Sequence, residues 1–363
     1  MWNRTAVTEL LGIKYPIIQG PFGGRFSSTR LVSMVSNLGG LGSFGLNSYD
    51  AEEILDIDKE IKSLTSHPYV LNLWVPLKKD PADIFNERDF AKVRESFRKY
   101  FDETGAPFPE KYEHSKLSFD DQIEAVIQAK PPIASFIFGV PPKELISELK
   151  LRGIVVMGTA TSLEEALLIE DSGFDLVIAS GSEAGGHRAS FIGSAEDSLS
   201  TTKDLLSAVV GKVRIPVIAA GGITTGNDIS EMLRIGADAA QMGTVFLATE
   251  ESDASAMHKR KLLSKTSFQT ALTKVFTGRL ARTITTPFIE NLDEIENDRL
   301  APYPIQSAIL SPLRKLAKEK GLLDFEAFWA GQPSQALKHK TTESLFSSLI
   351  KEASASSTFN HDP

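Results

Sequence analysis

The most consequential absence in this chain is cysteine, which is missing from all 363 residues. Without thiols there is no disulfide, no thiolate metal site, no iron–sulfur cluster and no cysteine nucleophile. Positive charge is also in short supply, since 39 Lys and Arg stand against 47 Asp and Glu, for a net charge of −8. This balance argues against a general nucleic-acid or anionic-membrane surface. Any phosphate site must therefore be local and built from backbone amides.

Long apolar runs and targeting segments are absent as well. No stretch reaches the ~18 apolar residues of a membrane-spanning helix, and the first residues resemble neither a signal peptide nor an anchor. No His, Asp and Glu residues have the spacing of metal ligands. We therefore expect a cytoplasmic protein that acts on small molecules without a metal, nucleic acid or membrane partner. Whether it forms a homodimer stays open.

What the chain does contain is a series of short apolar runs, most of them followed by a helical pattern. Runs that are apolar on both faces and end in Gly or a polar residue are typical of buried parallel strands. Eight such runs alternating with helices predict a (β/α)8 TIM barrel. The alternative is an open doubly wound sheet, but the glycines after the first run lack its usual Gly-x-Gly-x-x-Gly spacing. The predicted strands lie near residues 16–19, 41–44, 69–73, 133–136, 154–157, 176–179, 217–220 and 239–242. Between them, Ser162 with Glu165 three residues later predicts a helix start with a capping box, and residues 227–235 form another predicted helix, which ends at Gly236.

Two segments break this rhythm and suggest a domain organisation. We assign residues 1–250 to the barrel, with a charged, helix-prone insertion at 78–120 that packs over the barrel top or a partner subunit. Residues 251–325 form a smaller cap, and 326–352 return to the barrel as a helical segment. The small, polar residues 353–363 are expected to be disordered.

The segment Gly181-Ser-Glu-Ala-Gly-Gly-His187 follows one of the predicted strands directly. In a barrel the active site lies where strands end, and a histidine can move or donate a proton near neutral pH. We therefore predict His187 to be catalytic. Glu183 either orients this histidine or caps the loop. The other histidines are assigned to solvated or capping positions: His67, His114, His258, His339 and His361.

Glycines also follow the last two predicted strands, at Gly221-Gly222 and at Gly243-Thr244. Loops at these two positions form the usual phosphate site of such barrels, because glycines expose N–H groups and a Thr hydroxyl adds a donor. Each pair taken alone is equally explained by a tight turn. The two together favour a phosphate site. Asn72, at another strand end, offers an amide that can pair with a flavin edge.

At this point the motifs resemble the nitronate monooxygenases, formerly called 2-nitropropane dioxygenases, which are FMN-binding barrels. The resemblance runs from about residue 15 to about residue 331. Its most specific element is Glu183-Ala-Gly-Gly-His187. It also includes Pro16-Ile-Ile-Gln-Gly-Pro, Asn72-Leu-Trp-Val-Pro, Pro216-Val-Ile-Ala-Ala-Gly-Gly, Gln241-Met-Gly-Thr, Phe276-Thr-Gly-Arg and Trp329-Ala-Gly-Gln.

The resemblance implies non-covalently bound FMN and places the family's catalytic histidine on His187. Two positions depart from the family pattern. Ser180 stands where the family usually has a Gln that reaches the flavin, and Phe22 stands where a Met is common. Ser180 puts the substrate in doubt more than the cofactor. Strand ends and resemblance together give these cofactor-binding candidates: Gln19, Gly20, Pro21, Phe22, Asn72, Ser180, Gly185, Gly186, Gly221, Gly222, Gln241, Met242, Gly243 and Thr244.

The implied reaction is oxidation of an alkyl nitronate by O2 to an aldehyde or ketone plus nitrite, with the flavin carrying the redox chemistry. Neutral nitroalkanes are a further substrate to test. An alternative on the same barrel is FMN-dependent reduction of quinones or enoyl thioesters by NAD(P)H, because a fold does not fix a function. A flavin-free phosphate-barrel enzyme and a non-enzymatic flavin-binding protein also stay open.

Overall fold

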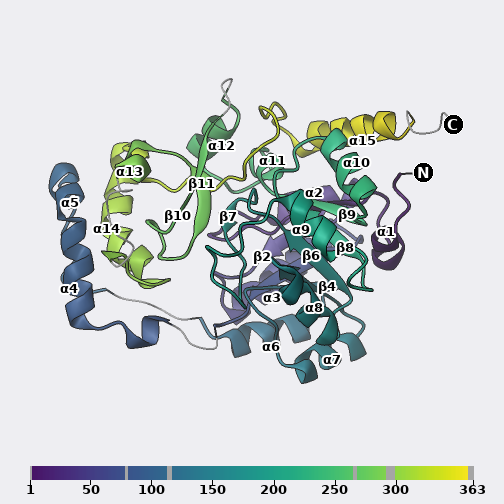
Figure 1. Cartoon of the computed structure of the whole chain (residues 1–363), viewed down its shortest axis with the longest axis horizontal. Coiled ribbons are helices and arrows are strands. Elements are labelled where there is room, and N and C mark those ends of the chain that lie inside the picture. The colour runs from purple at the N-terminus through teal and green to yellow at the C-terminus, as the bar shows by residue number, and fades with distance from the viewer. Residues whose placement is uncertain (1, 78–80, 113–116, 265–267, 292–298, 359–363) are drawn as a thin grey trace.

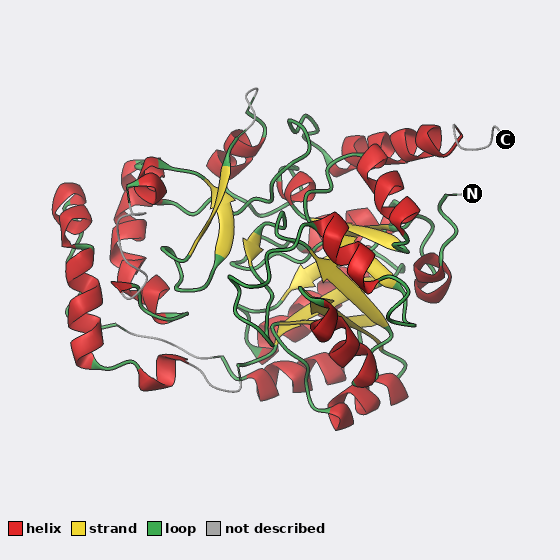
Figure 2. Cartoon of the chain, viewed as in Figure 1, coloured by secondary structure: helices red, strands yellow, loops and turns green. Residues whose placement is uncertain are grey.

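A closed barrel of eight parallel strands forms the larger part of the molecule (Figures 1 and 2). The computed structural model describes residues 2–77, 81–112, 117–264, 268–291 and 299–358. The strand order is β1-β9-β8-β6-β5-β4-β3-β2, and a parallel bridge between Ile18 and Leu41 joins the first strand to the last. This closure confirms the predicted (β/α)8 barrel and excludes the open sheet. The strands are β1 (Ile17–Gln19), β2 (Gly42–Gly45), β3 (Tyr69–Trp74), β4 (Ile133–Ile137), β5 (Val155–Ala160), β6 (Leu176–Ser180), β8 (Val217–Ala220) and β9 (Ala239–Met242).

The strands are buried on both faces, which explains why their sequences are continuously apolar. Side chains alternate across each strand, so that Ile17 packs outward against the helices and Ile18 inward. The inward residues share a core with Val7 and Leu11 of α1 (Ala6–Leu11). This short helix therefore plugs the amino-terminal end of the barrel and leaves the carboxyl end free for a site.

Helices cover the outside of the barrel, as the sequence pattern predicts. They are α2 (Thr29–Asn37), α3 (Ala51–Leu64), α6 (Phe119–Ala129), α7 (Lys143–Leu151), α8 (Leu163–Asp171), α9 (Thr202–Val209), α10 (Gly226–Ile235) and α15 (Thr342–Thr358). The helix predicted at 227–235 is confirmed as α10, and Gly236 ends it with a left-handed φ of 117°.

One predicted helix start is only half right. Ser162 does cap α8 by accepting a hydrogen bond from the Glu165 backbone N–H at 3.2 Å. The predicted capping box needs the Glu165 carboxylate to return to Ser162. That carboxylate is fully buried instead, and it accepts hydrogen bonds from Thr161 and from the backbone N–H groups of Phe191 and Ile192. It thus fixes the chain just beyond His187.

The predicted insertion and the C-terminal third share a second core. The helices α4 (Glu87–Ser96) and α5 (Arg98–Thr104) follow the 3-10 turn η1 (Pro81–Ile84) and lie beside α14 (Ile305–Lys320) in Figure 1. The shared apolar cluster includes Phe97 at the junction of α4 and α5, Phe101 from α5, and Ile309 and Leu313 from α14. The insertion therefore packs against the cap, through contacts between residues some two hundred positions apart in the sequence.

The rest of the cap is a small antiparallel sheet with short helices. Its strand order is β10-β11-β7. The two-residue strand β7 belongs to the loop after β6, so this sheet ties the barrel rim to the cap. The elements are β7 (Gly186–His187), β10 (Thr270–Thr273), β11 (Ala281–Ile284), α12 (Ala256–Leu262), α13 (Pro287–Glu290) and the 3-10 turn η3 (Leu323–Phe325). The short helix α11 (Thr244–Leu247) precedes the cap and directly follows β9 of the barrel.

The C-terminal helix α15 returns to the barrel and packs against α10 and α2. It continues through Thr358, so residues 353–358 are helical where the sequence pattern predicts a disordered tail, and residues 359–363 lie outside the described residues. The buried side chain of Ala353 gives this last part a packing contact that its composition does not reveal. The boundaries at 250 and 325 stay predictions.

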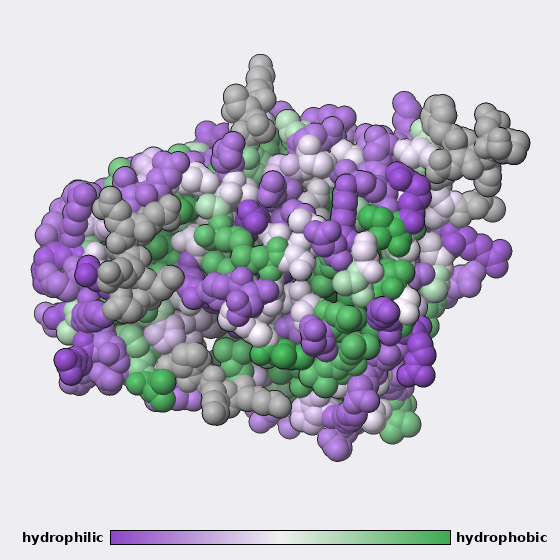
Figure 3. Space-filling view, viewed as in Figure 1, coloured by the Kyte–Doolittle hydropathy of each residue, from purple (hydrophilic) through white to green (hydrophobic). Residues whose placement is uncertain are grey.

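Among the described residues, no helix is both long and apolar enough to cross a bilayer. Figure 3 shows one face, where hydrophilic side chains gather over α4 and α5 and apolar patches alternate with polar ones elsewhere.

Candidate functional site

A cavity of about 400 Å³ lies at the carboxyl ends of the barrel strands and extends to the cap. This volume falls in the ~300–1,000 Å³ range of small-molecule sites. The loops after β1, β6, β8 and β9 line it, as do residues of α14 and the segment around Trp329. The predicted residues that line it are Gly20, Pro21, Phe22, Asn72, Ser180, Gly185, Gly186, His187, Gly221, Gly222, Gln241, Met242, Gly243 and Thr244.

Gln19 is the one predicted candidate outside this lining. Its side chain is fully buried between strands β1 and β2. The amide oxygen accepts a hydrogen bond from the Ser43 backbone N–H at 2.9 Å, and the amide nitrogen donates to the carbonyl of Gly20. Because both the oxygen and the nitrogen of the amide are hydrogen-bonded within the barrel wall, Gln19 stabilises the first loop without lining the cavity.

The β7–β11 pairing holds His187 at the rim of the cavity, opposite Ala281. Its imidazole lies among aromatic rings, with centroids 5.6 Å from Trp74, 5.6 Å from Tyr303 and 5.4 Å from Trp329. The Nε2 atom is 3.0 Å from the Thr277 hydroxyl, and Nδ1 has no hydrogen-bond partner among the described residues. One ring nitrogen is thus oriented by the protein and the other is left for a ligand.

The Thr277 hydroxyl can satisfy either neutral tautomer of His187. It lies 3.2 Å from the carbonyl oxygen of Arg279, to which it can donate while accepting from Nε2–H. It also accepts from the Arg279 backbone N–H at 3.4 Å, which leaves its own proton free to point at Nε2. In that second arrangement Nδ1 carries the ring proton.

The surroundings of His187 keep its ring uncharged. Burial, together with the nearby positive charge of Arg279, lowers the pKa of His187 to about 3. The Arg279 guanidinium lies over the Phe138 ring at 3.9 Å and donates to the carbonyl of Ser190 at 2.8 Å. Phe138 has a left-handed φ of 72°, a strained conformation for a bulky residue. A neutral histidine beside a fixed arginine favours an anion rather than a cation in the cavity.

Of the two roles considered for Glu183, the structure supports the capping one. Its carboxylate accepts hydrogen bonds from the Thr202 backbone N–H at 2.9 Å and from the Thr202 hydroxyl at 3.0 Å. It therefore holds the start of α9 and makes no hydrogen bond to His187. The role of orienting the imidazole belongs to Thr277.

The glycines after β8 and β9 have different structural reasons. Gly221 and Gly222 both have positive φ, at 117° and 70°, and a Cβ on Gly221 would lie 2.6 Å from the Thr202 hydroxyl. Gly221 is therefore explained by the turn itself. A Cβ on Gly243 would meet only Phe22, at 3.8 Å, so this residue faces open cavity space. The Thr244 hydroxyl accepts from the Gly331 backbone N–H at 2.8 Å and keeps its own proton for a ligand.

Two amides face the cavity from β3 and the loop after β2. The Asn72 side-chain N–H donates to the Ser135 hydroxyl at 2.8 Å, which leaves its amide oxygen as an acceptor. The Asn47 side-chain oxygen is buried and has no hydrogen-bond partner among the described residues. Buried acceptors without partners are costly, so the cavity is suited to a ligand that carries N–H donors.

Ser180 ends β6 with its short side chain in the cavity, as the sequence places it. Its carbonyl accepts a hydrogen bond from the Arg188 guanidinium at 3.2 Å, and the same guanidinium donates to the carbonyl of Ser198 at 2.6 Å. Arg188 is fully buried and holds the loop that carries His187. The amide of Gln241 reaches the same cavity from β9.

Several lining residues escape sequence reasoning because they come from the cap. Tyr303, Ser307 and Arg314 belong to α14 or the turn before it, where no strand end marks them. Thr277 and Trp329 fall within the motifs that carry the family resemblance, and that is their only local signal.

The assignment of the other histidines needs one correction. His258 is buried rather than solvated: its Nε2 lies 3.0 Å from the Trp329 carbonyl, and its ring contacts Phe26 and Phe328. Its place on α12, under the C-terminal segment, explains this burial. His67 is exposed, and His114 and His361 lie outside the described residues.

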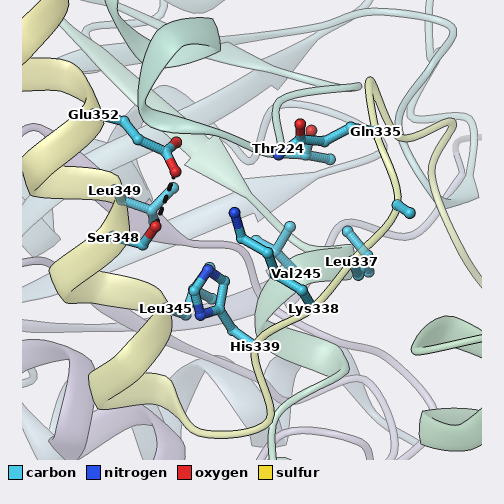
Figure 4. A pocket seen from close by; sticks show the side chains of 11 residues that line it. Thr224, Val245, Gln335, Leu337, Lys338, His339, Leu345, Ser348, Leu349 and Glu352 are labelled. Atoms are coloured by element: carbon cyan, nitrogen blue, oxygen red, sulfur yellow. Dashed lines mark hydrogen bonds between the residues drawn. The ribbon is translucent and has the colours of Figure 1, made fainter. Parts of the chain in front are cut away.

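A second, smaller hollow lies between α15 and the segment before it (Figure 4). Its volume of about 20 Å³ is room for roughly one water molecule. Lys338, His339 and Glu352 line it, and Ser348 donates to the Glu352 carboxylate at 2.8 Å. The larger cavity is therefore the candidate site. In the described part of the chain, no three His, Asp or Glu side chains gather as metal ligands would.

The closed barrel and a cavity containing a histidine at its carboxyl end define the class of protein, a TIM-barrel enzyme. A model of the nitronate monooxygenase family matches residues 4–352. A probable nitronate monooxygenase of Staphylococcus saprophyticus is 37% identical over 351 residues, which cover 96% of this chain and 97% of that protein. The corresponding protein of Staphylococcus haemolyticus is 34% identical over 354 residues, covering 97% and 98%.

Solved structures agree with these relatives. The nitroalkane oxidase of Streptomyces ansochromogenes superimposes with a TM-score of 0.86 at 33% identity, covering 98% of this chain and 99% of that one. FabK of Thermotoga maritima gives a TM-score of 0.73 at 27% identity, with 98% of both chains covered. The chain belongs to the nitronate monooxygenase family, and it is an oxidoreductase of a generally flavin-dependent group.

Proposed function

We propose that this protein uses FMN to oxidise alkyl nitronates with O2, giving a carbonyl compound and nitrite. The observation that carries the proposal is the neutral His187, held by Thr277 at the rim of the cavity and close enough to the Arg279 guanidinium to feel its charge. A nitronate is an anion, and such a site favours it over a cation. Membership of the family supports the same reaction.

The residues of the cavity fit FMN. The buried Asn47 oxygen and the Asn72 oxygen are acceptors for a ring edge with N–H groups. The open space at Gly243 and the Thr244 hydroxyl suit a phosphate. Gly222 and Gln241 would complete this set. When bound, FMN supplies the two-electron and one-electron redox chemistry that amino-acid side chains lack.

The task of His187 is to bind and orient the anion. With Nε2 accepting from Thr277, the Nδ1–H can donate a hydrogen bond to a nitronate oxygen. The cation of Arg279 adds long-range attraction without contacting the ligand. The surrounding rings of Trp74, Tyr303 and Trp329 exclude water and strengthen both interactions.

The low pKa of His187 also favours nitronates over neutral nitroalkanes. A ring with a pKa of about 3 is a weak base, so abstraction of a carbon-bound proton is unfavourable there. A nitronate arrives already deprotonated. Nitroalkanes are therefore expected to be turned over more slowly than the corresponding nitronates.

The test is an aerobic assay of nitrite release by the FMN-loaded protein. Ethyl nitronate and propionate 3-nitronate are expected to yield nitrite with consumption of O2, and nitroethane is expected to be the slower substrate. A yellow, FMN-loaded protein that releases no nitrite from either nitronate would contradict the proposal.

The reductase alternative is kept because FabK of Thermotoga maritima shares the fold over 98% of both chains. It predicts that NADPH bleaches the bound flavin rapidly in the absence of O2. We expect no rapid bleaching. A colourless protein that does not take up FMN would instead favour a flavin-free barrel enzyme.

A further inference from the structure

Arg314 is a partly buried cation that lines the cavity without a matching anion. It lies on α14, and its Nε atom is shielded from solvent and has no hydrogen-bond partner among the residues that the structure describes. Leaving such a donor unpaired is costly. Burial lowers the pKa of Arg314 and the carboxylate of Glu326 raises it, but arginine stays charged in proteins.

The lining of the cavity offers no compensating carboxylate. Among the described residues that line it, none is Asp, Glu or Lys. Glu326 is outside this lining and makes no ion pair with Arg314 within the described part of the chain. The guanidinium is therefore the one formal positive charge on the cavity wall in the part of the chain that the structure describes, next to aromatic and hydroxyl groups.

The position of Arg314 separates it from the phosphate loops. Its guanidinium lies 5.9 Å from the centroid of the Phe276 ring. The Phe276 and Trp329 ring centroids are 6.1 Å apart, and those of Trp329 and His187 are 5.4 Å apart. Ser307, seven residues earlier on the same helix face, also lines the cavity about 10 Å away along the axis. Arg314 thus lies on the cap side of the cavity, whereas Gly222 and Gly243 belong to the barrel loops.

We infer that Arg314 forms an anion-binding site at the cap end of the cavity, for a small oxyanion other than the cofactor phosphate. The inference rests on the proposed function, which supplies two possible anions. One is an anionic group at the far end of a nitronate substrate, and the other is the product nitrite. Both present the planar pair of oxygens that a guanidinium binds through two N–H groups.

The first experiment measures binding without turnover. Sodium nitrite and sodium propionate are titrated into the FMN-loaded protein by calorimetry at constant ionic strength. The wild-type protein is expected to bind at least one of them, and R314M is expected to bind it about 10-fold or more weakly, because a charged hydrogen bond is lost. R314K is expected to retain part of the affinity as a point charge without the planar fork.

The matched control is K315M, which removes the same charge from the neighbouring, exposed position of α14. It is expected to bind both anions as the wild type does. R314Q serves as a second variant should R314M fail to fold, because it keeps a side-chain amide donor without the charge. Equal anion affinity in wild type and in a folded R314M or R314Q would overturn the inference.

Kinetic measurements on R314M distinguish the two possible anions. A rise in KM for ω-carboxylated nitronates, with the KM for uncharged nitronates of equal length unchanged, assigns the site to the substrate. If the only change is weaker inhibition by nitrite, the site is assigned to the product. If neither changes in R314M, the inference is wrong. A protein that turns over no nitronate would contradict the proposed function but leave the calorimetric result intact.

Discussion

At the scale of single residues, the proposed chemistry depends on how His187 is held. Its pKa of about 3 keeps the ring neutral at physiological pH, and the Thr277 hydroxyl holds its Nε2 atom. The histidine itself could be selected from the sequence, because it follows a strand end in a glycine-rich loop. Thr277 is ninety residues away, and only the pairing of β7 with β11 brings the two together.

H187N is expected to retain its flavin and to lose most nitronate turnover, about 10²–10⁴-fold, because asparagine lacks the Nε2 atom that Thr277 holds and so loses the fixed orientation of the donor. The absorption spectrum reports the flavin, and nitrite release reports the turnover. H67N, at an exposed position, is the control. Wild-type turnover in H187N would refute the role of this residue.

T277V is expected to lower kcat/KM for nitronates about 10-fold, because valine cannot donate to Nε2 and the Nδ1–H tautomer loses its support. T277S, which keeps the hydroxyl, should stay near the wild type. The tautomer can be followed separately by ¹⁵N NMR of labelled histidine. Identical ¹⁵N shifts and kinetics in T277V and wild type would show that the hydroxyl has no such role.

At the scale of elements, the loops after β8 and β9 show that neighbouring glycines serve different purposes. Gly221 and Gly222 need positive φ, so a side chain there strains the turn whatever lies beside it. Gly243 has a φ of −103° and open space at its Cβ position. A substitution at Gly243 therefore fills cavity space without straining the backbone.

G243V is expected to weaken FMN binding about 10-fold or more, since its side chain would occupy the space assigned to the phosphate. Titration of apoprotein with FMN, followed by quenching of flavin fluorescence, measures the affinity. G193V is the matched control, because Gly193 also has only one neighbour, at 3.8 Å, but lies outside the cavity. Equal affinity in the two variants would count against the phosphate site.

At the scale of the whole molecule, buried histidine links stability to pH. His258 joins α12 to the C-terminal segment, and burial lowers its pKa from 6.5 to about 4. The unfolded chain therefore takes up a proton at a higher pH than the folded one. Its contribution to stability is full above pH 6.5 and is lost as the pH falls toward 4.

H258F should remove this pH dependence while keeping a ring between Phe26 and Phe328. Between pH 6 and 4.5, the slope of the free energy of unfolding against pH should then be smaller than in the wild type, by about 1.4 kcal/mol per pH unit. Denaturant titrations at a series of pH values measure the slope. H67N should keep the wild-type slope, and an unchanged slope in H258F would mean that His258 is protonated in the folded protein.

The barrel could be predicted in detail because its signals are local. Every strand is a short run of residues that are buried on both faces, so composition alone marks it. The cap could not, since α5 and α14 bury their apolar faces against each other across about two hundred residues of sequence. The short β7 strand gave no signal at all, because two residues have no periodicity.

The sequence by itself determined the eight strands, the loops at their carboxyl ends and the histidine beside them, since each follows from apolar runs and glycines that are adjacent in the chain. Only the tertiary structure decided which groups complete the site. Thr277 at the imidazole and Glu183 at the start of α9 acquire their partners through contacts between separate segments, and Arg314 reaches the cavity wall in the same way. Such contacts arise from packing of the cap on the barrel, and no local pattern encodes them.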